Sequence, residues 1–210
     1  MGEKAKQYLE IASAAGLLRL TPITPSTIRI SFVKGVTGTI QDTNWKAQAD
    51  TAVTWGAKES RSEVQLLTDR ILIRVEKANG AVQFLSRDSK KLLTENPSEP
   101  RLLLDSQTWN FFAWDKNERL KSKGVLADDF MDLSTKARYI SFGQKKLRMP
   151  LVLSNKGYAI GVAAGSTVLF CNVRTYGQYI YTQGTGQIDY YFIYDENQER
   201  NIEQYRNLPV

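Results

Sequence analysis

Apolar and polar residues alternate in short runs along most of this chain. The cleanest run, Thr27–Val33, predicts a β-strand, because alternate side chains of a strand point to opposite faces. A second strand is expected at Leu17–Leu20. The earlier segment Lys4–Ala15 is compatible with a helix or an edge strand, and we interpret it as a strand. The later runs predicted as strands are Thr108–Trp114, Arg138–Phe142, Pro150–Ser154, Tyr158–Val162, Thr167–Val173, Gln178–Thr182 and Gln187–Tyr194.

A β-hairpin is predicted around the dipeptide Asn79-Gly80. The runs Arg70–Glu76 and Ala81–Leu85 flank it, and Asn-Gly favours a type I′ turn with two residues at positive φ. Two regions give weaker signals. Gly35–Arg61 is polar and is predicted to be irregular or an edge. Asp115–Asp132 is predicted to be a connection with a short strand near Val125.

Strands recur about every ten residues with turn signals between them, which is typical of a sandwich or a barrel. A length of 210 residues fits one such domain. We therefore predict an all-β fold, an antiparallel β-sandwich, over residues 1–194.

The closing segment, residues 195–210, has a different pattern. Asp195 or Asn197 can cap a helix, and Ile202, Tyr205 and Leu208 then lie along one side of it. A helix of about three turns is marginal alone in water. We expect it to dock through these three residues, either on the sandwich or on something beyond residue 210.

Composition limits the chemistry that this chain can perform. It contains no histidine and a single cysteine, Cys171, which lies in an apolar run and is expected to be buried. No Ser-His-Asp or Cys-His pair can form, and the usual zinc ligand sets are excluded. We predict no metal site, no cofactor and no catalytic residues in this chain.

The net charge of +6 is spread along the chain in small basic groups such as Lys90-Lys91 and Lys145-Lys146. A nucleic-acid-binding face would concentrate such residues, so no nucleic-acid partner is expected. No segment is long and apolar enough for a signal peptide or a membrane span. These features predict a cytoplasmic protein without a membrane partner.

Three ordered segments resemble a known enzyme family. Met149–Val162 (MPLVLSNKGYAIGV) is similar to the I-P-F…S-S-K-G-Y-G hairpin of glycoside hydrolase family 31, Gly186–Tyr194 (GQIDYYFIY) to its I-D-Y-Y-F-I-Y-G strand, and Ile202–Leu208 (IEQYRNL) to its following I-x-x-Y-R-x-L helix. The segment Leu20–Ile30 resembles an early strand of the same family. Before about residue 140 the resemblance is otherwise weak.

The resemblance implies the N-terminal β-sandwich of an α-glucosidase or α-xylosidase, similar to the galactose-mutarotase sandwich. In that family the closing helix leads through Thr-Gly into a (β/α)₈ barrel, which carries both catalytic aspartates. Here Pro209-Val210 replaces Thr-Gly, and Glu118–Gly124 replaces the family's L-Y-G-x-G element. The resemblance thus implies that residues 195–210 connect to a catalytic barrel, the expected partner.

Carboxylates and aromatic rings are the remaining candidates for sugar contact. Asp128-Asp129 is the adjacent acid pair in a predicted loop, but adjacency alone does not give the carboxylate spacing of a glycosidase. Trp109 and Phe111 should share one face of a strand, and Phe112 and Trp114 the other. One face is expected in the core, and the other could bind sugar or a partner. Asp128, Asp129, Trp109 and Trp114 are therefore our candidates for sugar contact.

Three functions remain open from the sequence. The first is a non-catalytic domain that braces the barrel of a family-31-like α-glycosidase and helps to shape its sugar pocket, with no hydrolysis by this chain alone. The second is a free-standing carbohydrate-binding module. The third is a scaffold or self-association domain, with an exposed apolar patch around Tyr205 and Leu208.

Overall fold

The computed structural model describes residues 7–35, 37–41, 53–123, 130–134, 138–141, 149–163, 167–173, 175–184 and 186–208. Within them, short strands precede a single C-terminal helix. The strands are β1 (Leu9–Ser13), β2 (Gly16–Thr24), β3 (Thr27–Lys34), β4 (Gly56–Glu59), β5 (Glu63–Leu67), β6 (Ile71–Glu76), β7 (Val82–Ser86), β8 (Lys91–Thr94), β9 (Arg101–Leu104), β10 (Gln107–Phe111), β11 (Leu120–Lys123), β12 (Phe130–Asp132), β13 (Arg138–Ser141), β14 (Leu151–Ser154), β15 (Tyr158–Val162), β16 (Thr167–Val173), β17 (Gly177–Gln183) and β18 (Ile188–Tyr194), and the helix is α1 (Gln198–Arg206).

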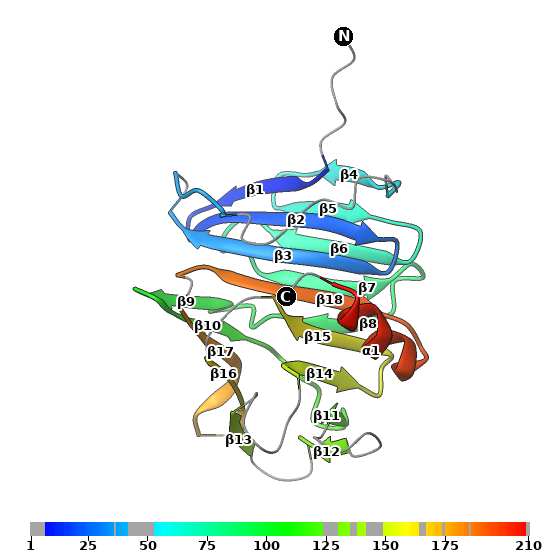
Figure 1. The fold of residues 1–210 in the computed structure, drawn as a ribbon. Helices are drawn as coiled ribbons and strands as arrows, with labels where there is room; N and C mark the ends of the chain where they lie inside the picture. Colours follow the sequence, from blue (N-terminus) through cyan, green and yellow to red (C-terminus); the bar gives the residue numbers. More distant parts are fainter. Residues whose placement is uncertain are drawn as a thin grey trace.

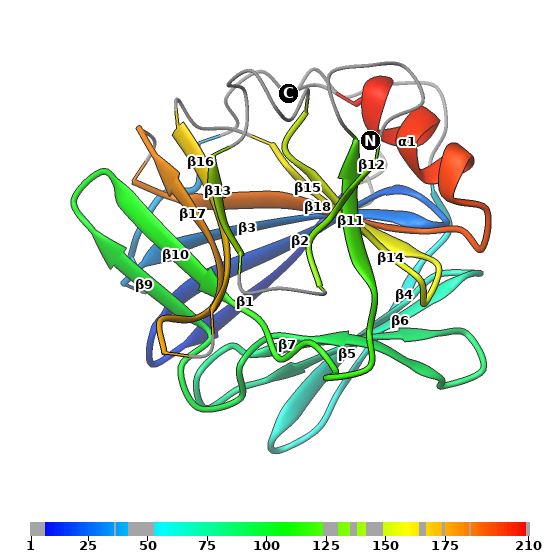
Figure 2. The same ribbon diagram turned by 90° about the horizontal axis from the view of Figure 1, so that it is seen from below.

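The strands form three antiparallel sheets. An eight-stranded sheet has the order β1-β2-β3-β18-β15-β14-β11-β12, and two five-stranded sheets have the orders β13-β16-β17-β10-β9 and β4-β5-β6-β7-β8. The two smaller sheets lie on the same side of the large one (Figures 1 and 2). The predicted all-β sandwich with a short C-terminal helix is confirmed.

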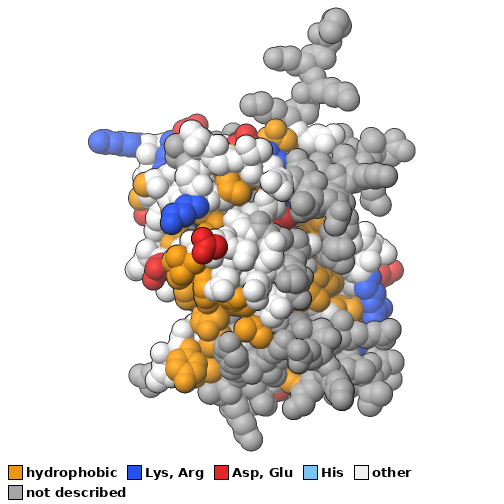
Figure 3. Space-filling view, turned by 60° about the vertical axis from the view of Figure 1, so that its left-hand side comes forward, with side chains coloured by type: hydrophobic (Ala, Val, Ile, Leu, Met, Phe, Trp, Pro, Cys, Tyr) orange, Lys and Arg blue, Asp and Glu red, His pale blue; other side chains and the backbone are white. Residues whose placement is uncertain are grey.

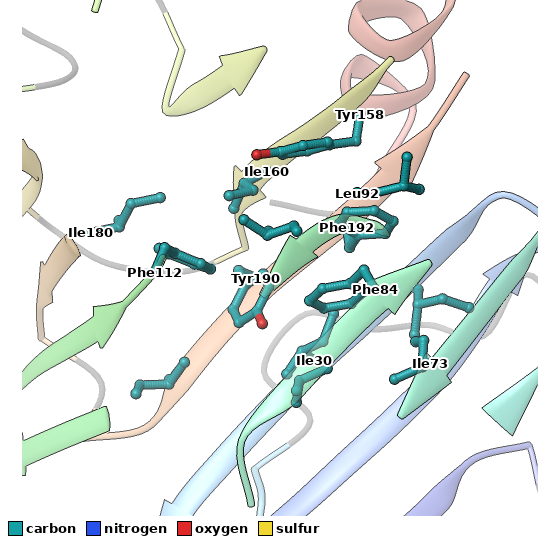
Figure 4. Close-up of a cluster of buried hydrophobic side chains, with 14 of the residues drawn as sticks. Ile30, Ile73, Phe84, Leu92, Phe112, Tyr158, Ile160, Ile180, Tyr190 and Phe192 are labelled. Atoms are coloured by element: carbon teal, nitrogen blue, oxygen red, sulfur yellow. The ribbon is translucent and has the colours of Figure 1, made fainter. Parts of the chain in front are cut away.

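The main core lies between the large sheet and the two smaller ones. Ile30 and Phe192 come from the large sheet, Phe84 from one small sheet and Ile180 from the other, and all belong to one buried cluster (Figure 4). The Phe84 and Phe192 rings stack with centroids 4.0 Å apart. One continuous apolar core therefore joins all three sheets.

Strand β18 is buried on both faces. Ile188, Tyr190 and Phe192 point into the main core, whereas Tyr191 and Ile193 belong to a second buried cluster on the opposite face. Helix α1 packs on that second face, against β14, β15 and β18. This double burial explains why the sequence of β18 is nearly continuously apolar instead of alternating with polar residues.

The hairpin between β6 and β7 forms as predicted, but the predicted turn type is wrong. Glu76 pairs with Ala81, so the loop contains four residues, and only Gly80 of the Asn79-Gly80 pair has a positive φ, at 76°. Asn79 instead accepts a hydrogen bond from the Ala81 amide at 2.9 Å and donates one to the Pro97 carbonyl at 2.6 Å. These side-chain bonds stabilise the longer loop.

Other predictions near the helix and the edges have clear outcomes. The segment Lys4–Ala15 contains strand β1, as interpreted, and Asn197 caps α1 by accepting from the Glu199 amide at 2.9 Å. Strand β4 lies within Gly35–Arg61, the region predicted to be irregular or an edge, and it forms the edge of its sheet. The strand expected near Val125 lies outside the described residues. No helix in the described ranges has the length and apolar character needed to cross a lipid bilayer.

Candidate functional site

The outer face of the β9-β10-β17-β16 sheet carries half-buried aromatic rings. Trp109 lies opposite Tyr181 and Phe111 opposite Tyr179 in the ladder between β10 and β17. Their ring centroids are 5.0 Å and 5.5 Å apart, with interplanar angles of 58° and 73°. The first pair is tilted and the second packs edge to face, so the rings do not form one flat platform across which a sugar could stack.

We call this surface the aromatic face. The described side chains that alternate onto it are Leu102, Leu104, Gln107, Trp109, Phe111, Thr167, Leu169, Cys171, Val173, Tyr179, Tyr181 and Gln183. None of these residues is charged, although 24% of the whole sequence is. Figure 3 looks toward this side of the molecule and shows hydrophobic side chains gathered there. Such a composition is typical of the centre of a binding surface.

The opposite face of the same segment is part of the core. Phe112 and Trp114 are 2% and 6% exposed, and their rings stack at 5.2 Å. Trp114 also contacts the Phe170 ring at 5.2 Å. The predicted division of the four aromatic residues between two faces is therefore present. It corrects the expectation for Trp114, because a buried ring between two others offers no face to a sugar.

Asp128 and Asp129, the predicted acid pair, lie outside the described residues. The buried acids that the structure does describe sit in three ion-paired clusters, centred on Glu95, Glu118 and Asp189.

Glu95 joins all three sheets. Its carboxylate pairs with Arg101 of β9, accepts from the Tyr190 hydroxyl of β18 at 2.8 Å and accepts from the Val82 amide of β7 at 2.9 Å. Arg101 also donates to the Gly80 carbonyl at 2.9 Å. Burial, and then the Glu95 charge, raise the pKa of Tyr190 well above its ordinary value. This cluster holds the sandwich together.

Glu118 occupies a similar position beside β14 and β15. It accepts from the Ser154 hydroxyl at 2.5 Å and from the Tyr158 hydroxyl, and Lys156 lies 3.0 Å away. Burial and the Glu118 carboxylate raise the pKa of Tyr158 well above its ordinary value. The Ser154-x-Lys156-x-Tyr158 portion of the hairpin that resembles family 31 thus serves to bind a buried acid.

The third cluster lies on the face of the large sheet opposite the main core. Arg29 of β3 holds Asp189 of β18 through two hydrogen bonds of 2.8 Å and 2.5 Å, and Ser31 adds a third at 3.1 Å. Gln187 donates to the same carboxylate at 3.3 Å. Sequence reasoning missed this pair, although a charge in the interior of each of two strands rich in apolar residues is a signal for it.

These clusters do not resemble an acid–base centre. Each carboxylate is already bound by a cation and by hydroxyl or amide donors, so its oxygens are engaged within the fold. Two of the hollows in the described residues illustrate what the surface offers. An open groove of about 360 Å³ over β4, β5 and β6 is lined by Lys58, Arg87 and leucines, and a cavity of about 10 Å³ beside Asn110 could hold one water molecule. Neither is lined by two carboxylates.

Metal binding has no support in the described ranges, where no group of three or more His, Cys, Asp or Glu residues could hold an ion. Cys171 is buried and free, as expected from its apolar surroundings.

Helix α1 docks on its own domain. Ile202 and Tyr205 are 1% and 3% exposed, and the Tyr205 hydroxyl donates to the Val162 carbonyl at 2.7 Å. Leu208 is partly buried against the same cluster. Gln204 accepts from Ser26 and Thr27 at 3.1 Å and 2.9 Å. The apolar patch expected around Tyr205 and Leu208 is therefore mostly used within the sandwich.

Taken together, these observations define a closed β-sandwich with ion-paired acids inside, one aromatic outer face and a docked C-terminal helix. No protein-family model matches the sequence, and no curated protein sequence matches it either.

Several solved structures share the fold. A glycoside hydrolase family 31 dextranase from Flavobacterium johnsoniae matches 97% of this chain, with 16% identity and a TM-score of 0.74. A cycloalternan-forming enzyme from Listeria monocytogenes matches 95%, with 16% identity and a TM-score of 0.73. A family 31 α-xylosidase from a soil metagenome matches 99%, with 17% identity and a TM-score of 0.73. The match covers only 28%, 21% and 34% of those three chains.

Proposed function

We propose that this chain is a non-catalytic domain of an α-glycosidase related to glycoside hydrolase family 31. It would be the N-terminal β-sandwich that braces a (β/α)₈ barrel and helps to shape the sugar pocket. The observation that carries the proposal is the fold match, which takes in nearly all of this chain and a fifth to a third of three carbohydrate-active enzymes. The three sequence motifs point to the same family.

The interior of the domain supports a bracing role. Its buried acids are consumed by structural ion pairs, and its helix is fixed to the sheet by the Tyr205 hydroxyl and by Gln204. Such a domain can present a fixed surface to a neighbour without contributing reacting groups.

Two measurements test this proposal. The purified chain should release no product from aryl α-glucosides or aryl α-xylosides, and turnover that survives repurification would overturn the non-catalytic role. The coding sequence downstream of Val210 should encode a (β/α)₈ barrel with two catalytic aspartates. A stop codon directly after Val210 would contradict the proposed place in a larger enzyme.

A second candidate function is carbohydrate binding at the aromatic face. It is favoured by the half-exposed Trp109 ring beside Tyr181, with Gln107 and Gln183 adjacent in the ladder. Aromatic rings and amides of this kind suit a neutral sugar. Calorimetry with isomaltotriose and maltotriose should show binding that Trp109→Ala abolishes and Tyr176→Ala preserves. Equal binding by both variants would place any sugar site elsewhere.

A further inference from the structure

Strand β9 forms one end of its sheet and carries backbone groups that no described strand binds. It pairs only with β10, and the sheet order ends there. The Phe111 amide donates to the Pro100 carbonyl at 2.9 Å, so Phe111 and Pro100 form a hydrogen-bonded pair next to the β9–β10 ladder. Because hydrogen-bonded pairs alternate in antiparallel strands, Arg101 and Leu103 direct their N–H and C=O groups away from β10. Four backbone groups therefore face the free edge.

The outer side of this edge carries no charged residue that would oppose pairing with another strand. Natural edges commonly carry lysine or proline, and edge strand β4 carries Lys58 and Glu59 with every residue exposed. On β9 the outward side chains are Leu102 and Leu104, and Leu104 is 51% exposed. The one charge of the strand, on Arg101, turns inward to Glu95. Beside this edge lies the uncharged aromatic face.

We propose that β9 is a self-association edge, occupied by β9 of a second copy of this chain. An antiparallel pair with its two-fold axis at Leu102 places Arg101 opposite the partner's Leu103, and Leu103 opposite the partner's Arg101. In that register the two N–H and two C=O groups of each copy all meet a partner, which makes four hydrogen bonds. Leu102 packs against the partner's Leu102 on the outer side.

A second copy fits this edge better than a strand of unrelated sequence. The pairing needs apolar side chains at alternate positions on one side, and β9 itself supplies them. The strand itself adds no local charge repulsion at the contact, because its one cation, Arg101, is paired inward with Glu95. The result is a continuous ten-stranded sheet whose uncharged outer face spans both copies. This inference is independent of the glycosidase proposal.

Sedimentation velocity over a wide concentration range tests the proposal. The unmodified chain should move from monomer to dimer as concentration rises. Leu102→Lys should weaken dimerisation at least about tenfold, because it places two like charges opposite each other. Tyr176→Lys is the matched control: it makes the same charge change at a 69% exposed aromatic residue in the turn between β16 and β17, off the edge, and it should leave dimerisation unchanged. Leu104→Lys gives a second edge variant should Leu102→Lys fail to fold.

Hydrogen exchange supplies an independent readout. The Arg101 and Leu103 amides should exchange more slowly in the concentrated sample, while the β4 edge amides should not change. A chain that stays monomeric at every concentration would overturn the proposal. A dimer weakened as much by Tyr176→Lys as by Leu102→Lys would also overturn it, because the contact would then not be specific to the β9 edge.

Discussion

Two apolar outer faces of this sandwich differ in their burial: one is covered by helix α1 and the other stays partly exposed. The face formed by β14, β15 and β18 is built with the small residues Ala159, Gly161 and Ala163, and α1 packs directly on it. The aromatic face on β10 and β17 is built with large rings, and the one described helix packs elsewhere. Small residues therefore mark where a second element approaches closely, whereas the large rings stay partly exposed in the described structure.

Alkaline pH should give the largest loss of stability, because the buried phenols that ionise lie on the face covered by α1. Burial raises the pKa of Tyr191 to about 12 and also raises the pKa of Tyr205. The unfolded phenol titrates near about 10, so this stabilisation is fully present below about pH 10 and is lost as pH rises through about 12. Denaturant midpoints measured between these values, with tyrosinate absorbance followed in parallel, should fall continuously.

Tyr205→Phe is the control for this experiment, because it keeps the ring and removes the ionising group. Its midpoint should depend less steeply on pH than that of the unmodified chain. Midpoints that stay level up to about pH 12 would show that the buried phenols do not limit alkaline stability.

Substituting each of two tryptophans compares the stability contributed by the core with that contributed by the aromatic face. Trp114→Ala should destabilise the domain by about 3–5 kcal/mol, because it leaves a cavity between Phe112 and Phe170. Trp109→Ala should cost only about 1 kcal/mol, because its ring is half exposed and removing it opens no closed cavity. Urea unfolding of both variants measures the difference. Equal losses would mean that the aromatic face is as fully packed as the core.

Gly161 tests the close approach of the helix. A Cβ atom at this position would lie 2.2 Å from Cε2 of Tyr205, so Gly161→Ala must displace the ring. We expect a loss of about 1–3 kcal/mol in the free energy of unfolding, from overpacking. The matched control is Gly56→Ala on β4, where no atom lies within 4 Å, and its stability should stay close to that of the unmodified chain. A neutral Gly161→Ala would contradict tight docking.

The smallest effect is expected at the start of the helix. Asn197→Ala removes the side-chain acceptor of the Glu199 amide and should cost about 1 kcal/mol. The loss should appear in helix protection from hydrogen exchange while the β10 and β17 amides are unaffected. Loss of protection in both regions would show that the covered and open faces unfold together from the helix.

Local patterns predicted much of this fold. The alternation of apolar and polar residues located strands such as β3 and β15. The odd and even positions between Trp109 and Trp114 correctly divided four aromatic residues between two faces. The alternation could not predict which face is buried, because burial depends on pairing with strands far away in the sequence. The Asn79-Gly80 pair predicted a hairpin, but the Asn79 side chain bonds to Pro97 and Ala81, contacts that local propensity does not include.

The site could be predicted less well, because its contacts are long-range. The stripe of Ile202, Tyr205 and Leu208 predicted a docked helix but not the surface on which it docks. That surface includes Gly161, more than 40 residues earlier in the sequence. Arg29 and Asp189 meet across 160 positions. Strand β9 was not predicted from its four residues, and its importance comes only from its place at the end of a sheet.

The Glu95 cluster has a consequence for how the domain melts. One carboxylate contacts β7, β9 and β18, which belong to three different sheets. Separating any one sheet from the others would leave an unpaired charge in an apolar interior. This costs more free energy than unfolding the whole cluster at once. The three sheets should therefore unfold in a single cooperative transition, with no stable partly opened species.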